Sequence, residues 1–235
     1  MSEFRLTQIS DTHLARRLAS LTANFHRLSE YIDTRRPDLV VNSGDLAFDA
    51  PTSPDDLEFA RSLHAALPVP CRYLPGNHDI GDNPTALGPT PPQPATEQGR
   101  QAFIAAFGDD RWRFEAAGWC FIGLNSLVMN TGIASEAEQF DWLAAQLADT
   151  GGKPVALFLH KPLFLHEPGD PELAASAIRY VPMPARSAWW RCWNRSICGW
   201  SPAAMSTSAG ILRIAGSGTS GRRRPDLSSR TSARR

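Results

Sequence analysis

The chain has 235 residues, of which 42% are hydrophobic and 20% charged, and its formal net charge is zero. This composition is typical of a globular protein and excludes a disordered or membrane-like chain, while the neutral total gives no general attraction to nucleic acid or anionic membrane. No apolar stretch approaches the roughly 20 residues that cross a bilayer, and Met1–Thr7 lacks a signal-peptide pattern, so we expect a cytoplasmic protein.

The first third of the chain predicts strands and helices in alternation. Phe4–Ser10, Leu39–Ser43 and Val69–Leu74 are apolar runs that predict strands. Between them, Leu18–Asp33 has apolar residues at helical spacing, and Asp55–Leu67 is a second predicted helix. Such alternation is typical of an α/β protein whose sheet is covered by helices.

The middle of the chain begins with a predicted surface loop, Asp82–Thr96, which is rich in Pro, Gly and Asn. The elements predicted after it are helix Gln101–Phe107, a hairpin of Trp112–Phe114 and Trp119–Leu124, helix Ser135–Ala148 and strand Pro154–His160. Ser135 and Glu138 have the spacing of a capping box, in which each would satisfy a free backbone N–H at the start of that helix.

Polar turns follow four of the predicted strands. They are Asp11-Thr12-His13, Gly44-Asp45, Gly76-Asn77-His78-Asp79 and Leu159-His160-Lys161-Pro162. In open α/β sheets ligands bind outside the carboxyl ends of the strands, so we expect these side chains to converge. Imidazole nitrogens mixed with carboxylate and amide oxygens suit divalent first-row metals. One shared oxygen ligand would hold two such ions roughly 4 Å apart.

Each of these residues has a structural alternative when it is considered alone. Asp11 and Asp45 are common turn or helix-capping residues, and Asn77 is a common residue in a tight left-handed loop. His160 alone could be a hydrogen-bonded histidine at a strand end, and His78 alone could lie on the surface. The metal-site hypothesis therefore rests on four turns that occur in order, each after a strand.

The ordered set of Asp-x-His, Gly-Asp-Leu, Gly-Asn-His-Asp and a later histidine resembles the signature of the calcineurin-like metallophosphoesterases. The resemblance covers about Phe4–Pro184 and is nearest to the bacterial branch with cyclic-nucleotide phosphodiesterases and glycerophosphodiesterases. It implies an α/β fold, a four-layer sandwich of two mixed β-sheets flanked by helices, with an incomplete C-terminal portion.

The resemblance also implies two divalent metal ions, with Fe, Mn, Zn and Co all compatible with the ligands. Asp11 and His13 would bind the first ion, Asn77 and His160 the second, and Asp45 would bridge both.

By the same resemblance, the reaction would be hydrolysis of a small-molecule phosphodiester by metal-activated water. His78 would be a catalytic proton donor or transition-state stabiliser near the leaving-group oxygen. Asp79 would orient His78 or stabilise its charge.

The composition changes after about Ala185. The family pattern ends in a Gly-His-x-His turn that completes both metal sites, whereas the last histidine of this chain is His166. Four of the seven tryptophans are Trp189, Trp190, Trp193 and Trp200. We therefore divide the chain into an incomplete metallophosphoesterase domain, 1–186, and an aberrant low-order tail, 187–235.

A shifted reading frame accounts for the missing turn. Ala203–Ser208 can be back-translated as GCG GCC ATG TCC ACC AGC, and starting at the third base gives GGC CAT GTC CAC CAG, which encodes Gly-His-Val-His-Gln. The slip would lie near Ala185–Ala188. Sequencing the locus tests this hypothesis, because an uninterrupted frame with other codons at Ala203–Ser208 would contradict it.

Two alternatives to an active phosphoesterase stay open. The chain could be a catalytically impaired or inactive remnant, because the Gly-His-x-His ligands are absent. Arg222-Arg223-Arg224 could mark a nucleic-acid-binding extension, but nucleic acid is not the expected partner, because this tail lacks lysine and any binding-fold signature. The exact substrate and the oligomeric state cannot be read from the sequence.

Overall fold

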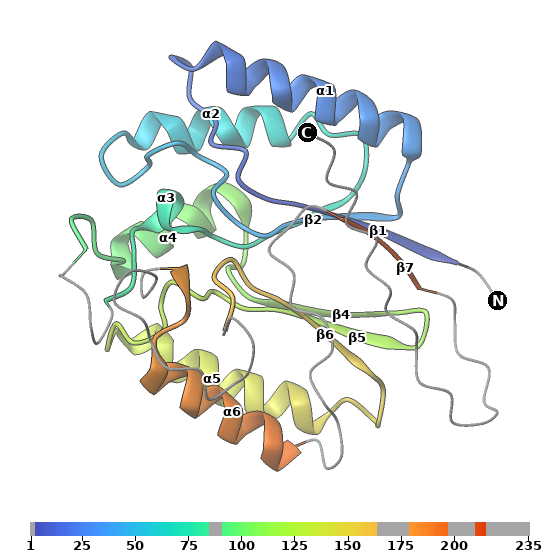
Figure 1. Ribbon diagram of the computed structural model, residues 1–235, viewed down its shortest axis with the longest axis vertical. Helices are drawn as coiled ribbons and strands as arrows, with labels where there is room; N and C mark the ends of the chain where they lie inside the picture. Colours follow the sequence, from blue (N-terminus) through green and yellow to red (C-terminus); the bar gives the residue numbers. More distant parts are fainter. Residues whose placement is uncertain (1–2, 85–90, 164–178, 197–209, 215–235) are drawn as a thin grey trace.

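Two mixed β-sheets lie face to face in the computed structural model, which describes residues 3–84, 91–163, 179–196 and 210–214 (Figure 1). Helices α1 and α2 cover the outer face of one sheet, and α5 and α6 cover the outer face of the other (Figure 1). The predicted four-layer sandwich is therefore confirmed. No helix of the described ranges is both long and apolar enough to cross a membrane.

The first sheet has the strand order β3-β2-β1-β7. Its strands are β1 (Phe4–Ile9), β2 (Leu39–Asn42), β3 (Cys71–Tyr73) and β7 (Gly210–Ile214). β1, β2 and β3 run parallel, and β7 pairs antiparallel with β1. The helices between the parallel strands are α1 (Ala19–Arg35) and α2 (Pro54–His64). Parallel strands need such crossovers, which is why helices alternate with strands in this part of the chain.

The second sheet has the order β4-β5-β6. Its strands are β4 (Trp112–Ala116), β5 (Trp119–Gly123) and β6 (Val155–Phe158), with β4 antiparallel and β6 parallel to β5. The remaining helices are α3 (Asn77–Ile80), α4 (Glu97–Phe107), α5 (Ala134–Ala148) and α6 (Met183–Ser196). The hairpin predicted from the two tryptophan-led segments is therefore confirmed.

The two sheets are held together by the side chains on their facing surfaces. Leu6, Leu39 and Val41 of the first sheet form one buried cluster with Phe121 and Phe158 of the second. Full burial of each such side chain contributes about 1.5–3 kcal/mol. The strand residues between them point the other way, because successive side chains alternate across a sheet, and these pack under α1.

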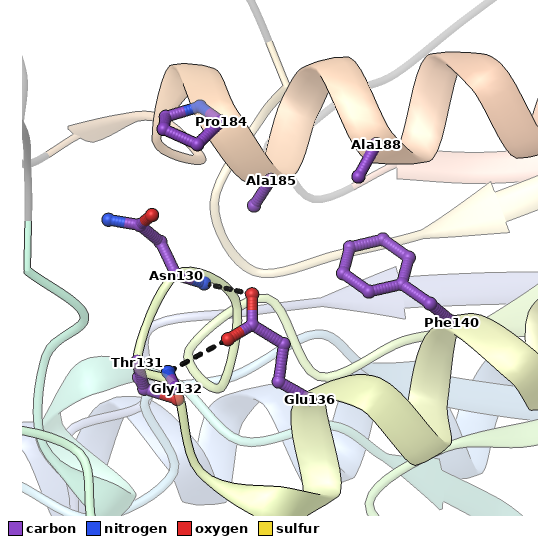
Figure 2. A pocket seen from close by; sticks show the side chains of 8 residues that line it. All are labelled: Asn130, Thr131, Gly132, Glu136, Phe140, Pro184, Ala185 and Ala188. Carbon is purple, nitrogen blue, oxygen red and sulfur yellow. Dashed lines mark hydrogen bonds between the residues drawn. The ribbon is translucent and has the colours of Figure 1, made fainter.

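Two helix starts differ from the prediction. α4 begins four residues before the predicted Gln101, because Thr96 caps it by accepting a hydrogen bond from the Gly99 N–H at 3.0 Å. The predicted capping box of α5 is wrong, since the residue before the helix is Ile133 and no side chain caps it there. Instead Glu136 accepts hydrogen bonds from the N–H groups of Asn130 and Gly132 (Figure 2).

The structure describes two elements beyond Ala185 where the sequence predicted a low-order tail. α6 crosses the predicted boundary at residue 186 and runs to Ser196. Ala185 and Trp189 of α6 lie about one helical turn apart and are buried in one cluster with residues of α5. β7 needs only its backbone N–H and C=O groups to pair with β1, so the weak strand pattern in its sequence did not reveal it.

A hollow of about 420 Å³ lies between α6 and the start of α5. Pro184, Ala185 and Ala188 line it from α6, opposite Phe140 and Glu136 (Figure 2). None of the five predicted metal ligands and neither of the two predicted catalytic residues lines this hollow.

We predict that His64 makes the stability of the fold depend on pH. Its ring is packed against Phe25, Tyr73 and Phe107, and neither ring nitrogen has a hydrogen-bond partner in the described part of the chain. Burial lowers its pKa from 6.5 to about 3. Above pH 6.5 His64 therefore leaves the free energy of unfolding unchanged. As the pH drops towards 3, that free energy falls by at most about 1.4 kcal/mol per pH unit, because the unfolded chain takes up a proton that the folded chain does not.

Urea unfolding of His64→Phe and of the parent chain between pH 7 and pH 4 measures this effect. The variant should lose less stability on acidification, because it cannot take up a proton when it unfolds. His26→Gln is the control, since His26 is exposed. Equal acid sensitivity of the parent and His64→Phe would contradict the prediction.

Candidate metal centre

The structure brings all seven predicted residues to one region beside the carboxyl ends of the strands. Turns after β1, β2, β3 and β6 carry them, so both sheets contribute. The residues are Asp11, His13, Asp45, Asn77, His78, Asp79 and His160. These residues span about 150 positions of the sequence, and the ends of the strands that precede them bring them close together.

The Asp45 carboxylate lies at the centre of this group. Its Oδ2 is 3.6 Å from Nε2 of His13, and its Oδ1 is 3.5 Å from Nε2 of His160. Oδ1 also accepts a hydrogen bond of 3.0 Å from the backbone N–H of His78. Burial raises the pKa of Asp45, and the His78 N–H opposes that rise. One carboxylate is therefore shared between two imidazoles on different segments.

Both ring nitrogens of His160 face oxygen atoms. Its Nδ1 is 3.1 Å from the carbonyl oxygen of Ser43, and its Nε2 is 3.3 Å from Oδ1 of Asn77 and 3.5 Å from Oδ1 of Asp45. Burial lowers the pKa of His160, which favours the neutral ring with a single N–H. If Nδ1–H donates to Ser43, a lone pair on Nε2 faces two oxygens, and a cation between them removes that repulsion.

His13 offers a second nitrogen to the same group. Its Nε2 lies 3.8 Å from Oδ1 of Asp11 as well as near Asp45. Burial lowers the pKa of His13, so its neutral form carries a lone pair that can bind a metal. Its Nδ1 is buried and has no hydrogen-bond partner among the described residues. The residues present therefore fit divalent cations on both sides of Asp45.

His78 belongs to the cluster more directly than the sequence predicted. His13, Asp45 and His78 each offer one ligand atom, and these atoms lie within 4.8 Å of one another. The rings of His13 and His78 meet edge to face with centroids 4.6 Å apart. Nδ1 of His78 is 2.5 Å from the carbonyl oxygen of Phe48. A carbonyl only accepts, so this Nδ1 carries the proton and Nε2 is left for other partners.

Asp79 does not make the contact predicted for it. Its carboxylate accepts hydrogen bonds from the backbone N–H groups of Leu46, Ala47 and Gly76, at 3.2, 2.8 and 2.8 Å. The described contact that orients the His78 ring is the Phe48 carbonyl instead. Burial and the nearby charge of Asp45 raise the pKa of Asp79 to about 7. Asp79 therefore joins the Asp45 turn to α3 through the backbone.

Three of the polar residues have a backbone conformation that L-amino acids seldom adopt. The φ angles of Asp11, His13 and Asp45 are 57°, 45° and 56°. Such conformations cost of order 1–3 kcal/mol each and persist only where the surrounding structure imposes them. Here backbone bonds between the two turns impose them, since His13 N donates to Asp45 O and Asp11 N donates to Gly44 O, both at 3.0 Å.

Two glycines that were not singled out as site residues are required by the packing. A Cβ on Gly44, whose φ is +123°, would lie 2.4 Å from Nδ1 of His160. A Cβ on Gly76 would lie 2.1 Å from Oδ1 of Asp45. The Gly-Asp and Gly-Asn-His-Asp motifs already contained both residues, so their spacing was a usable signal. The carbonyls of Ser43 and Phe48 had no such signal, because every residue carries one.

Several residues of interest lie outside the described part of the chain. They include His166, the segment Ala203–Ser208 and part of the loop Asp82–Thr96.

The model of the calcineurin-like phosphoesterase family matches residues 4–185, and the chain belongs to this family. It is 30% identical over 182 residues to "Glycerophosphodiester phosphodiesterase GpdQ" of Enterobacter lignolyticus, covering 67% of this chain and 56% of that protein. It is also 30% identical to "3',5'-cyclic adenosine monophosphate phosphodiesterase CpdA" of Escherichia coli K12, covering 66% and 54%. The chain thus spans about half the length of these relatives.

Solved structures of metallophosphatases share the fold. A dimetal phosphatase from Danio rerio aligns with a TM-score of 0.56 and 14% identity, covering 82% of this chain and 77% of that one. The purple acid phosphatase PPD1 of yellow lupin aligns with a TM-score of 0.55 and 15% identity, covering 83% and 36%. The fold is therefore that of the metallophosphatases, in agreement with the family to which the chain belongs.

We predict that Gly76→Ala disrupts the centre. Gly76 has an ordinary extended backbone, so the expected effect comes from the collision of the new Cβ with Asp45. Overpacking of this kind costs about 1–3 kcal/mol, and the displaced carboxylate should bind Mn²⁺ less tightly. Urea unfolding and equilibrium dialysis against Mn²⁺ measure the two effects.

Gly132→Ala is the matched control for this variant. Gly132 has a φ of +74° and no atom within 4 Å of an added Cβ. Alanine there should cost stability through backbone strain and leave Mn²⁺ binding intact. Parent-like Mn²⁺ binding by Gly76→Ala would show that Asp45 tolerates the displacement.

Proposed function

We propose that this chain derives from a dinuclear metal-dependent phosphodiesterase acting on small substrates of the cyclic-nucleotide or glycerophosphodiester type. The observation that carries the proposal is the Asp45 carboxylate, whose two oxygens face His13 and His160 separately. The substrate class follows from the activities named for the GpdQ and CpdA relatives. The cytoplasmic location stays a prediction.

The proposed ligands fall on either side of Asp45. Asp11 and His13 would bind one cation, and Asn77 and His160 the other, with Asp45 common to both. Fe, Mn, Zn and Co suit this donor set. When bound, two such cations supply an ionised water near neutral pH and polarised phosphoryl oxygens.

The protein residues would provide orientation and a proton. The Phe48 carbonyl holds His78 through Nδ1, which leaves Nε2 on the side of the cluster. We propose that His78, in its doubly protonated form, keeps the Nδ1–H on the Phe48 carbonyl and donates the proton on Nε2 to the leaving-group oxygen. Asp79 would support this step indirectly, because its bonds to Gly76, Leu46 and Ala47 hold α3 against the Asp45 turn.

A second candidate is a remnant with little or no activity. It is favoured by the sequence, which has no histidine after His166 to complete either metal site. We propose that residues 187–235 are out of frame and that 1–186 is the incomplete enzyme domain. In this reading the Asp45 cluster is retained while each cation lacks one imidazole.

The proposed ligand roles predict a distinct result for each variant in equilibrium dialysis. Asp45→Asn should weaken both Mn²⁺ sites, His13→Ala should weaken one, and His160→Ala the other, because each removes different donor atoms. His78→Ala should retain both ions. Loss of both ions in His78→Ala would instead make His78 a ligand, as its position in the cluster allows.

The loss of the final turn predicts weak hydrolysis. The metal-loaded chain should hydrolyse a generic aryl phosphodiester more than about tenfold more slowly than a version with the Gly-His-x-His frame restored, because each missing imidazole weakens one cation site. Cyclic nucleotides and glycerophosphodiesters tested with the restored version would then identify the substrate class. Rates within tenfold of each other would contradict the prediction.

A further inference from the structure

A buried lysine directly follows the metal-site residue His160. The side chain of Lys161 is 4% exposed, and its ammonium group contacts the carboxylate of Asp82 and, at 2.7 Å, Oδ1 of Asn83. Burying the Lys161 charge costs desolvation energy that its attraction to the partly exposed Asp82 does not always recover, so such a pair is weak evidence for a stabilising role. Its position in the fold suggests another role.

The pair connects the two chain segments that meet at the second cation site. Lys161 is the neighbour of His160, and Asp82 follows α3, which begins at Asn77. Nε2 of His160 lies 3.3 Å from Oδ1 of Asn77. Asn77 follows β3 of the first sheet, whereas His160 follows β6 of the second. The distance between these two proposed ligands therefore depends on how the segments are fastened.

A third segment completes the connection. Ser126, in the loop after β5, accepts a hydrogen bond of 3.0 Å from the Lys161 backbone N–H. Asn83 donates from its side-chain amide to the carbonyl oxygens of Ser126 and Met129, at 3.0 and 3.1 Å. These bonds tie the Asp82–Asn83 segment to the strand ends of the second sheet.

We propose that Lys161 is a positioning residue that sets the separation of Asn77 and His160 through Asp82 and Asn83, and so determines cation affinity at the second site. This inference rests on the proposed function, because it needs a cation bound by Asn77 and His160. Asp11 and His13, the proposed ligands of the first site, lie on the turn after β1 of the first sheet, so we expect that site to be independent of Lys161. Partners of this kind typically change metal affinity by about 10- to 100-fold.

The test measures Mn²⁺ binding by the full chain in two ways. Equilibrium dialysis gives the affinity, and the electron paramagnetic resonance signal of coupled Mn²⁺ pairs reports whether both sites are filled. His13→Ala and His160→Ala identify the two sites. Lys161→Met should weaken Mn²⁺ at the His160 site by about tenfold or more, remove the coupled signal, and leave the His13 site unchanged.

Two further variants separate positioning from general destabilisation. Lys153→Met is the matched control. Lys153 lies just before β6, whereas Lys161 lies just after it, and Lys153 forms an ion pair with Glu115 at the surface. It should leave both Mn²⁺ sites unchanged. Lys161→Met combined with Asp82→Asn removes both charges, so stability to urea should recover while affinity at the His160 site stays low.

The outcomes distinguish this inference from the proposed function. Parent-like affinity at both sites in Lys161→Met would overturn the positioning role and leave the dinuclear site intact. Equal weakening of both sites, or recovery of affinity with stability in the double variant, would also overturn it, since either result indicates general destabilisation. A parent chain that binds no Mn²⁺ at the His160 site would overturn this inference together with the proposed second site.

Discussion

The structure depends on one shared carboxylate. Asp45 contacts His13 through one oxygen and His160 through the other, and so it joins a turn of the first sheet to a turn of the second. Where Nε2 of a ring carries no proton, its lone pair faces the carboxylate oxygen, and a cation between the two atoms removes that repulsion. Burial lowers the pKa of both imidazoles, which favours the neutral rings whose nitrogen lone pairs can bind a metal.

The scaffold supports this arrangement at a cost in backbone strain. Asp11, His13 and Asp45 have positive φ angles, and Gly44 and Gly76 leave no room for a Cβ beside the site. Rigid packing compensates for that strain, because the cluster between the sheets fixes the strand ends from which the turns start. The strain therefore falls on three of the residues that we propose as metal ligands.

Much of the fold and site could be predicted because the signals are local. The strands at Phe4, Leu39 and Trp119 are apolar runs, and α1 has a clear helical period. α6 and β7 were not predicted, because one depends on packing against α5 and the other on backbone pairing with β1. The capping box predicted for Ser135 is absent for a similar reason. The start of α5 is instead joined to the preceding loop, because Glu136 accepts hydrogen bonds from two of its N–H groups.

The sequence by itself determined which polar side chains follow the strands, because the four motifs carry their chemistry in residue types and spacing that do not depend on the rest of the fold. It also showed that no histidine follows His166. Only the tertiary structure decided which atoms meet: the Phe48 carbonyl at His78, the backbone partners of Asp79, and Lys161 bound to Asp82. Apart from the Gly76–Asp79 bond, these contacts join residues 30 to 79 positions apart. They form only when β2 and β3 pair side by side and, for Lys161 and Asp82, when the two sheets pack together.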